Sequence, residues 1–149
     1  MMKIILGSDH GGRKLKEEIK GLLDEMKISY EDAGCDCDTS VDYPDYAKPV
    51  AKRVAKGEFE RGILICGTGI GMSIAANKVK GIRCAVVTDE YSARMSREHN
   101  NANVLALGER VVGIDLAKSI VRTWLTAEFQ GDRHLRRLQK VEQMEADDE

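Results

Sequence analysis

The sequence lacks any large excess of charge: its 149 residues carry a formal net charge of −2. No broad positive field is therefore present to hold nucleic acid or an anionic membrane surface. Long hydrophobic runs are also missing, because the apolar start at 4–6 is followed at once by polar residues. Such a stretch is too short for a signal-peptide core or a membrane span. We expect a cytoplasmic protein with neither nucleic-acid nor membrane partners.

Internal repeats, low-complexity linkers and a break between two domains are absent from the sequence as well. Apolar residues make up 42% and charged residues 32%, which is typical of a globular chain and argues against disorder. The length suits one domain with its own hydrophobic core. The sequence therefore predicts a single domain over residues 1–149.

Cysteines are few, and no export signal accompanies them. The four are Cys35, Cys37, Cys66 and Cys84. Cys35 and Cys37 have one residue between them and no histidine or cysteine at zinc-site spacing, so no metal site is expected. Because no export signal is present, we expect reduced thiols rather than a disulfide framework.

Short apolar runs alternate with stretches of helical periodicity along the chain. This alternation predicts an α/β fold, a three-layer α/β/α sandwich of Rossmann-like type with a five-stranded parallel sheet. Strands are expected at 3–8, 28–31, 62–66, 84–88 and 104–107. Helices are expected at 12–26, 44–54, 72–78, 89–98 and 114–127, with a last one after 131. Pro44 suits a helix start, Pro49 should kink that helix or delay it, and the acidic end at 145–149 should fray.

Three glycine-containing segments follow predicted strands: Gly7–Gly12, Cys66–Gly71 and Gly108–Arg110. Ligands bind at the carboxyl ends of the strands in an open parallel sheet, so these segments should share one location. Glycines in the middle segment let the backbone approach a phosphate or an enediolate oxygen, although a tight packing turn would need them too. The segment matches neither a Walker loop nor the dinucleotide-binding fingerprint.

Cys66 is the most informative single residue. Its thiol ends a strand and faces the start of a helix, which favours the thiolate and hence a role as base or nucleophile. The alternative is a small buried hydrophobic residue, which describes Cys84 well. A cysteine phosphatase would need an arginine six residues further on, where this chain has Met72. That class of enzyme is therefore excluded.

Polar residues elsewhere fit either a site or an ordinary surface. Asp9 and His10 place a carboxylate and an imidazole at the same sheet edge, but a solvated turn would look the same. His99 closes a polar helix, where a histidine can simply interact with the helix end.

Two arginines near the carboxyl end carry the same ambiguity. Arg133 and Arg137 are four residues apart, so they share a helix face and could hold one dianion. A solvated cationic face is the alternative. Arg136 points elsewhere on the same helix.

Together these segments resemble ribose-5-phosphate isomerase, type B, in order and over nearly the whole chain. Most of the resemblance comes from the long stretch Cys66-Gly67-Thr68-Gly69-Ile70-Gly71-Met72-Ser73-Ile74-Ala75-Ala76-Asn77-Lys78. The other matching segments are Ser8–Gly12, Tyr43–Tyr46, His99–Asn100, Gly108–Arg110, and Arg133 with Arg137. The same superfamily includes galactose-6-phosphate and allose-6-phosphate isomerases.

The resemblance implies an aldose–ketose isomerase of the non-oxidative pentose phosphate pathway, acting on D-ribose 5-phosphate and D-ribulose 5-phosphate without cofactor or metal. Cys66 would be the base that moves a proton between C2 and C1, through an enediolate. His99, helped by Thr68 and Asp9, would open the furanose ring. The substrate-binding residues implied are Asp9, His10, Tyr43, Gly67, Thr68, Gly69, Ile70, Gly71, Asn100, Arg110, Arg133 and Arg137.

Within that set, the resemblance assigns parts of the substrate to groups of residues. Backbone N–H groups of Gly67–Gly71 would stabilise the oxyanion. Asn100 and Tyr43 would bind sugar hydroxyls. The phosphate would be held by His10, Arg110, Arg133 and Arg137.

The resemblance also bears on assembly and on the choice of base. Family members form dimers or tetramers with the active site at a subunit interface, so a homo-oligomer is expected. Some relatives use a glutamate as base, whereas Cys66, followed by Met72 and Ser73, places this chain in the thiol-using group. Cys35 and Cys37 match no family motif and receive no role.

Two rival functions stay open at this stage. One is a six-carbon sugar-phosphate isomerase, because the sequence does not give the depth of the pocket. The other is a non-catalytic sensor of sugar phosphates or nucleotides. A sensor would need the phosphate-binding residues but has no use for a thiol base with a separate ring-opening histidine.

Overall fold

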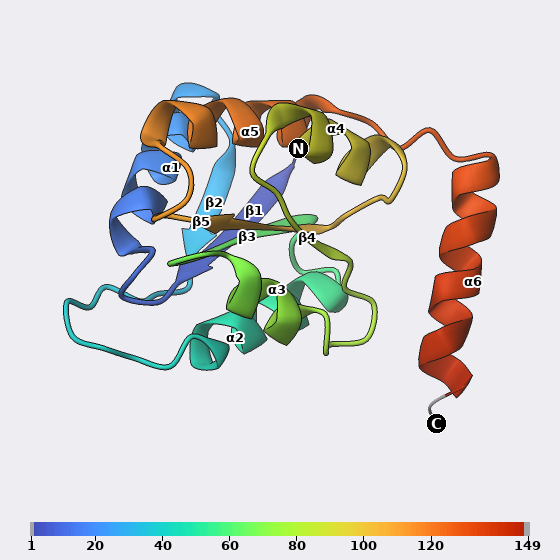
Figure 1. Cartoon of the computed structure of the whole chain (residues 1–149), viewed down its shortest axis with the longest axis horizontal. Helices are drawn as coiled ribbons and strands as arrows, with labels where there is room; N and C mark the ends of the chain where they lie inside the picture. Colours follow the sequence, from blue (N-terminus) through green and yellow to red (C-terminus); the bar gives the residue numbers. More distant parts are fainter. Residues whose placement is uncertain (1, 148–149) are drawn as a thin grey trace.

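The computed structural model describes residues 2–147 as a parallel five-stranded sheet between two layers of helices (Figure 1). The order of the strands in the sheet is β2-β1-β3-β5-β4. The strands are β1 Lys3–Ser8, β2 Ser29–Asp32, β3 Arg61–Cys66, β4 Cys84–Val86 and β5 Val104–Gly108. The helices are α1 Arg13–Glu25, α2 Pro44–Ala55, α3 Ile70–Ala76, α4 Glu90–Glu98, α5 Ile114–Thr126 and α6 Arg133–Asp147. The predicted fold class is confirmed.

The three central strands are apolar on both sides, because each side is covered by helices. Ile4 and Leu6 of β1 belong to the core beneath α1 and α5, with Trp124 of α5 fully buried in it. Ile5 of β1 and Leu64 of β3 point the other way, into the core beneath α2 and α3. Continuous apolar runs are typical of parallel strands buried in this manner.

Most element boundaries agree with the sequence prediction within a residue or two, and the differences lie at the edges. The edge strand β4 ends at Val86, two residues early, and β2 begins at Ser29. Helix α2 starts at Pro44 and continues through Pro49, so the expected delay does not occur. The expectation of a frayed acidic end is wrong for 145–147, which are helical, and 148–149 lie outside the described residues.

The expectation of four reduced thiols is also wrong, because Cys35 and Cys37 form a disulfide. Their Cα atoms lie 5.4 Å apart, within the range that a disulfide spans. The N–H of Cys35 bonds to the carbonyl of Ser8 at 2.8 Å, which holds this loop against the end of β1. Two cysteines separated by one residue indicate neither a zinc site nor an exported protein. In the folded loop, however, their sulfurs lie close enough to bond. Cys66 and Cys84 are free.

A buried lysine anchors the loop that follows β2. Lys16 is fully buried and donates to the Asp32 carboxylate at 2.8 Å and to the carbonyl of Cys35 at 2.7 Å. Lys20 adds a second bond to Asp32 at 2.9 Å. Burial alone would raise the pKa of Asp32, but its bonds to Lys16, Lys20 and the N–H of Gly34 outweigh that effect and lower it. The ion pairs thus hold the loop against β1 and α1.

Within residues 2–147, no helix is both long enough and apolar enough to cross a membrane.

Candidate active site

The turns that follow β1 and β5 are hydrogen-bonded to the end of β3, at the carboxyl edge of the sheet. Asp9, after β1, donates its N–H to the carbonyl of Ile65 at 3.3 Å. Glu109, after β5, donates its N–H to the carbonyl of Cys66 at 2.9 Å. The prediction that the three strand-end segments share one location is therefore confirmed.

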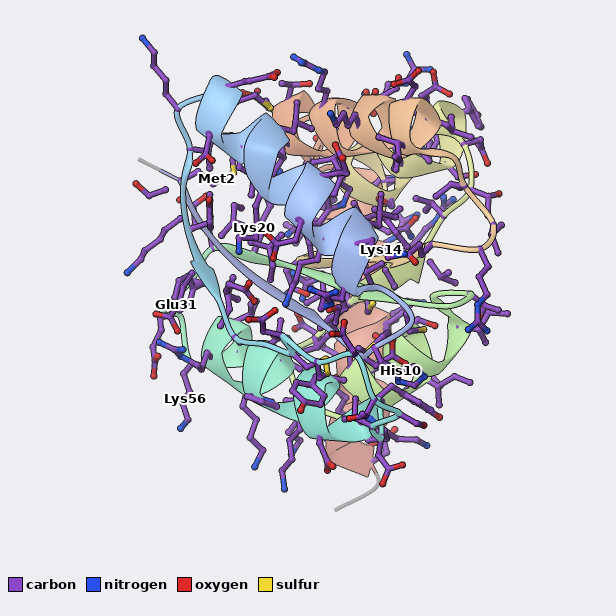
Figure 2. The ribbon with its side chains drawn as sticks, turned by 90° about the vertical axis from the view of Figure 1, so that its left-hand side faces the viewer. Met2, His10, Lys14, Lys20, Glu31 and Lys56 are labelled. Carbon is purple, nitrogen blue, oxygen red and sulfur yellow. A yellow bond between two sulfur atoms is a disulfide. The ribbon has the colours of Figure 1, made fainter. Side chains whose placement is uncertain are left out.

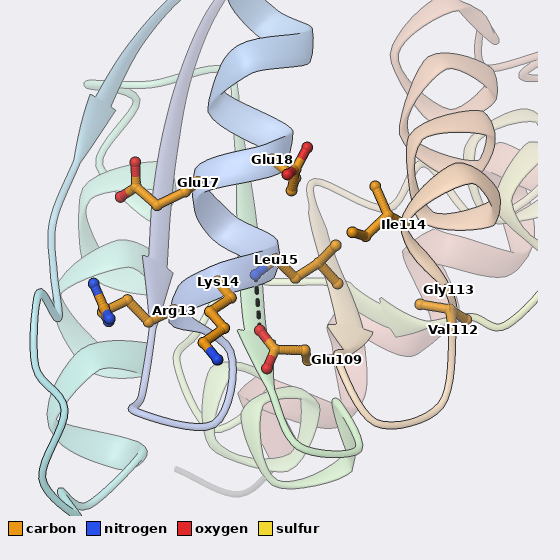
Figure 3. Close-up of a pocket in the computed structure, with 9 residues that line it drawn as sticks. All are labelled: Arg13, Lys14, Leu15, Glu17, Glu18, Glu109, Val112, Gly113 and Ile114. Carbon is orange, nitrogen blue, oxygen red and sulfur yellow. Dashed lines mark hydrogen bonds between the residues drawn. The ribbon is translucent and has the colours of Figure 1, made fainter.

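The same turns approach so closely that glycine is required. A Cβ atom placed on Gly12 would lie 2.4 Å from the carbonyl oxygen of Ile65. Helix α1 begins immediately after Gly12, and Glu109 accepts the N–H of Leu15 at 2.7 Å (Figure 3). A carboxylate is well placed at a helix N-terminus, so this bond fixes α1 relative to the turn after β5.

Cys66 lies where β3 ends and the glycine loop begins. Its side chain is 95% buried, with 5% exposed, and its Sγ accepts the N–H of Gly69 at 3.2 Å. This bond fixes the position of the sulfur relative to the glycine loop. Burial raises the pKa of the thiol of Cys84, the other free cysteine, to about 12.

The loop after Cys66 requires glycine at position 69. Gly69 has φ of 81°, and a Cβ there would lie 2.9 Å from the carbonyl carbon of Leu107. Thr68 is exposed, and its Oγ1 accepts the N–H of Ile70 at 3.2 Å. The loop therefore directs the backbone N–H of Gly69 at the thiol, at a sheet edge where ligands bind.

A hollow lined in part by His10 and Arg110 adjoins this loop. Its other charged residues are Arg13, Lys14, Asp38 and Glu109. The Nδ1 of His10 accepts the N–H of Val41 at 3.1 Å, so the neutral ring carries its proton on Nε2, which can donate to an anion. Arg110 bonds through its N–H to the carbonyl of Gly67 at 3.0 Å. Figure 2 shows His10 in the turn between β1 and α1.

Two further residues of the predicted set complete this edge. The Asp9 side chain is buried, and its Oδ1 accepts the N–H of Gly11 at 2.9 Å. Tyr43 precedes α2 and lies over the first turn of α3: a Cβ on Gly71 would come within 2.8 Å of two of its ring carbons. Tyr43 is 38% exposed.

Four other predicted residues lie at the opposite edge of the sheet. His99 and Asn100 follow α4 and precede β5, so they stand at the amino ends of the strands. Helix α5 runs back from the carboxyl edge, and α6 follows it at the same amino edge, set apart from the layered body (Figure 1). Arg133 and Arg137 of α6 line one hollow together with His99 and Asn100.

The arrangement of the arginines agrees with the helical spacing. Arg133 and Arg137 both line this hollow, as their shared face predicts, whereas Arg136 is not among the residues that line it. The hollow is lined by the two guanidinium groups, the His99 imidazole and the Asn100 amide. Such a set suits a phosphate with an adjoining polar group.

Sequence reasoning missed one residue of this second hollow, His134. It is 6% exposed and stacks on His99, with ring centroids 4.1 Å apart and planes 11° from parallel. Burial lowers the pKa of His134, and the positive charges of His99, Arg133 and Arg137 lower it further. A histidine between two arginines in a polar helix gives no signal of burial, so the sequence alone could not have singled it out.

The predicted residues thus form two sets on one chain. The carboxyl-edge set contains the thiol, the glycine loop, Asp9, His10, Tyr43 and Arg110. The amino-edge set contains His99, Asn100, Arg133 and Arg137. Because parallel strands separate these edges by the full length of the sheet, a single chain does not bring the two sets together.

Comparisons with known proteins agree with this architecture. Residues 4–141 match the family described as Ribose/Galactose Isomerase. Ribose-5-phosphate isomerase B of Escherichia coli is 51% identical over 97% of each chain. The structure of Clostridium thermocellum ribose-5-phosphate isomerase B is 59% identical and superimposes with a TM-score of 0.98, over 99% of this chain and 100% of that one. D-erythrulose-4-phosphate isomerase 2 of Mycolicibacterium smegmatis is 47% identical over 86% of each chain.

A family match over nearly the whole chain, with identities of this size, decides the class. The chain belongs to the ribose/galactose isomerase family of sugar-phosphate isomerases. Relatives of similar identity carry the names of five-carbon and four-carbon enzymes.

Proposed function

We propose that the protein interconverts D-ribose 5-phosphate and D-ribulose 5-phosphate, with Cys66 as the base. The observation that carries the proposal is the Cys66 sulfur, held at the carboxyl edge of the sheet with the N–H of Gly69 at 3.2 Å. A base in that place stands beside a loop of backbone donors. This pairing is what proton transfer next to a carbonyl requires.

The chemistry follows from these two parts. The Cys66 thiolate takes the proton from C2 of the open-chain aldose, and the electron pair moves to give an enediolate. Backbone N–H groups of Gly67–Gly71 stabilise the negative oxygen. The thiol then returns the proton to C1 while the remaining hydroxyl proton moves from O2 to O1, which yields the ketose and regenerates the thiolate.

Ribose 5-phosphate is mostly a closed furanose, so its ring must open before that proton transfer. We assign ring opening to His99, with help from the Thr68 hydroxyl and the Asp9 carboxylate. Moving a proton between the ring oxygen and the anomeric hydroxyl is general acid–base work, for which imidazole suits neutral pH.

A complete site on this scheme needs two copies of the chain. Cys66 and His99 lie at opposite edges of the sheet, so the amino-edge set of one copy must face the carboxyl-edge set of another. Helix α6 supports such pairing, because only His134 and Leu138 of its residues are buried in the single chain. Its exposed apolar side chains, which a partner could cover, are Leu135, Val141 and Met144. The assembly is a homodimer, alone or within a tetramer.

The phosphate would then be bound by residues of both copies of the chain. His10 and Arg110 supply donors at the carboxyl edge, and Arg133 and Arg137 supply guanidinium groups from the partner's α6. Tyr43 and Asn100 are left for the sugar hydroxyls.

A second candidate is a four-carbon sugar phosphate, as the name of the relative from Mycolicibacterium smegmatis indicates. A four-carbon aldose phosphorylated on its last hydroxyl cannot close a furanose ring. Its isomerisation therefore needs the thiol base but no ring opening by His99. The two candidates place different demands on the same site.

The test is a comparison of kcat/KM for the purified protein with ribose 5-phosphate, erythrose 4-phosphate, allose 6-phosphate and galactose 6-phosphate. The proposal requires the ribose ester to be the best substrate. A higher kcat/KM with erythrose 4-phosphate would favour the second candidate, and a preference for either hexose phosphate would contradict both. No turnover of any of the four would contradict the isomerase assignment.

A further inference from the structure

The second hollow contains a contact between the side chains of His99 and His134, which the proposed chemistry does not use. The rings lie face to face, with centroids 4.1 Å apart and an interplanar angle of 11°. His99 is the C-cap of α4, and His134 lies in the first turn of α6. Two segments more than thirty residues apart are thus joined through these imidazoles.

Hydrogen bonds near the two histidines fix the segments that carry them. Gln130, just before α6, donates its backbone N–H to the carbonyl of Glu98 at 3.0 Å and its side-chain amide to the Glu98 carboxylate at 3.0 Å. The N–H of His134 bonds to the carbonyl of Gly131 at 3.0 Å. The segment before α6 is therefore joined to the end of α4 through Gln130 and Glu98, next to the stacked rings.

His134 itself is an unusual side chain to bury here. It is 6% exposed, and its Nε2 is buried with no hydrogen-bond partner. An unsatisfied buried nitrogen costs free energy, so such a group requires an explanation. A contact with substrate does not supply it, because Nε2 has no accessible surface through which to reach a ligand.

We propose that His134 is a positioning residue for His99, holding the ring-opening imidazole in one orientation by stacking against its face. The proposal rests on the function proposed above, in which His99 moves protons on the furanose ring. Arg133 and Arg137 flank His134 on the same helix, so the stack also sets His99 relative to the phosphate-binding arginines.

The physical reason is orientation. A histidine at a helix end has two free side-chain torsions, and a proton transfer loses rate steeply when the ring rotates away from its partner. A flat ring in face contact removes that freedom. Burial, together with the nearby positive charges, lowers the pKa of His134 and so favours its neutral ring. A neutral face can stack on His99 in either protonation state, whereas two imidazolium rings would repel.

The test compares His134→Ala with His134→Phe in the full-length protein. Loss of the stack in His134→Ala should lower kcat for ribose 5-phosphate about ten- to a hundredfold, with little change in KM; this is less than the roughly 10²–10⁴-fold of general acid–base catalysis, because His99 itself remains. Phenylalanine keeps a flat ring but no nitrogen, so His134→Phe should recover most of kcat. If His134→Phe is as slow as His134→Ala, the nitrogen is needed and positioning by stacking is wrong.

A double-mutant cycle separates positioning from general loosening of α6. In a His99→Asn background there is no imidazole to orient, so His134→Ala should lower kcat no further. An additional loss equal to that in the parent protein would show that His134 acts independently of His99, and would overturn the proposal.

Proton NMR provides a readout that needs no substrate. The His99 ring signals should be shifted by the ring current of the stacked neighbour, should move in His134→Ala and should stay close to their parent positions in His134→Phe. An unshifted His99 in the parent protein would overturn the stack whatever the activity. If the ring-current shift is present but ribose 5-phosphate is not turned over, the proposed function fails and the positioning proposal, which depends on it, fails too.

Discussion

The backbone N–H of Gly69 points at the sulfur of Cys66 from 3.2 Å, and Gly69 reaches this position by adopting φ of 81°. Few residues tolerate that conformation, so the donor depends on glycine. The sulfur is thus held as a hydrogen-bond acceptor at the edge of the sheet where ligands bind.

The first prediction concerns this thiol. Cys66→Ala should fold and bind sugar phosphate but lose nearly all isomerisation, at least a hundredfold in kcat, because no other group replaces the base. Cys84→Ala is the matched control: Cys84 is the other free cysteine, and burial raises its pKa to about 12. Rates with ribose 5-phosphate check both variants. Near-normal turnover by Cys66→Ala would remove the mechanism.

The second prediction concerns the phosphate. Arg137→Ala should raise KM for phosphorylated sugars about ten- to a hundredfold, the value of one charge-assisted hydrogen bond. Arg136→Ala is the control, because Arg136 is exposed on the same helix but is not among the residues that line the hollow. Equal effects of the two changes on KM would place the phosphate elsewhere.

The third prediction concerns the packing that places the catalytic loop. Gly12→Ala should destabilise the protein by roughly 1–3 kcal/mol, because the new methyl would lie 2.4 Å from the carbonyl oxygen of Ile65. Gly21→Ala is the control: Gly21 lies within α1 with nothing within 4 Å of the added methyl, so alanine there should stabilise the helix. Urea unfolding at fixed protein concentration measures both. Equal stability of the two variants would mean that the turn can move away from β3 without cost.

The sequence was sufficient for the sheet, because the buried strands β1, β3 and β5 are short apolar runs that end at or beside glycines, which favours strands over helices. The edges were less certain, since β2 and β4 have weaker patterns and their ends depend on neighbours. Pro49 illustrates the same limit: its effect depends on which side of α2 it faces, and it is exposed. Likewise, the Cys35–Cys37 disulfide arises from a loop conformation that residue spacing does not encode.

The candidate site likewise has one part that the sequence predicts and one part that it does not. The residues at the carboxyl edge follow strand ends directly, so topology places them together from sequence alone. The position of α6 depends instead on tertiary contacts such as those between Gln130 and Glu98. The burial of His134 therefore could not be predicted.

The fourth prediction concerns pH. His134 has a lowered pKa in the folded protein and an ordinary value near 6.5 when unfolded. Below about pH 6.5 the unfolded chain therefore binds more protons than the folded chain. The corresponding stability of the folded protein is fully present above that pH and is lost as the pH falls. His134→Phe cannot titrate there. Its free energy of unfolding should fall less than that of the parent between about one pH unit above and about one unit below 6.5. An identical fall in both proteins would contradict the lowered pKa.

The central claim, a thiol-dependent isomerase whose site is shared between two chains, is tested most directly by mixing two inactive variants. Cys66→Ala keeps the amino-edge set, and His99→Asn keeps the carboxyl-edge set. After subunits are unfolded together and refolded as an equal mixture, half of the dimers should contain one copy of each, and one of their two sites should be fully intact. Activity with ribose 5-phosphate should then return to about a quarter of the parent level for random pairing of a twofold dimer. A mixture that forms mixed dimers but remains as inactive as its components would contradict the shared site.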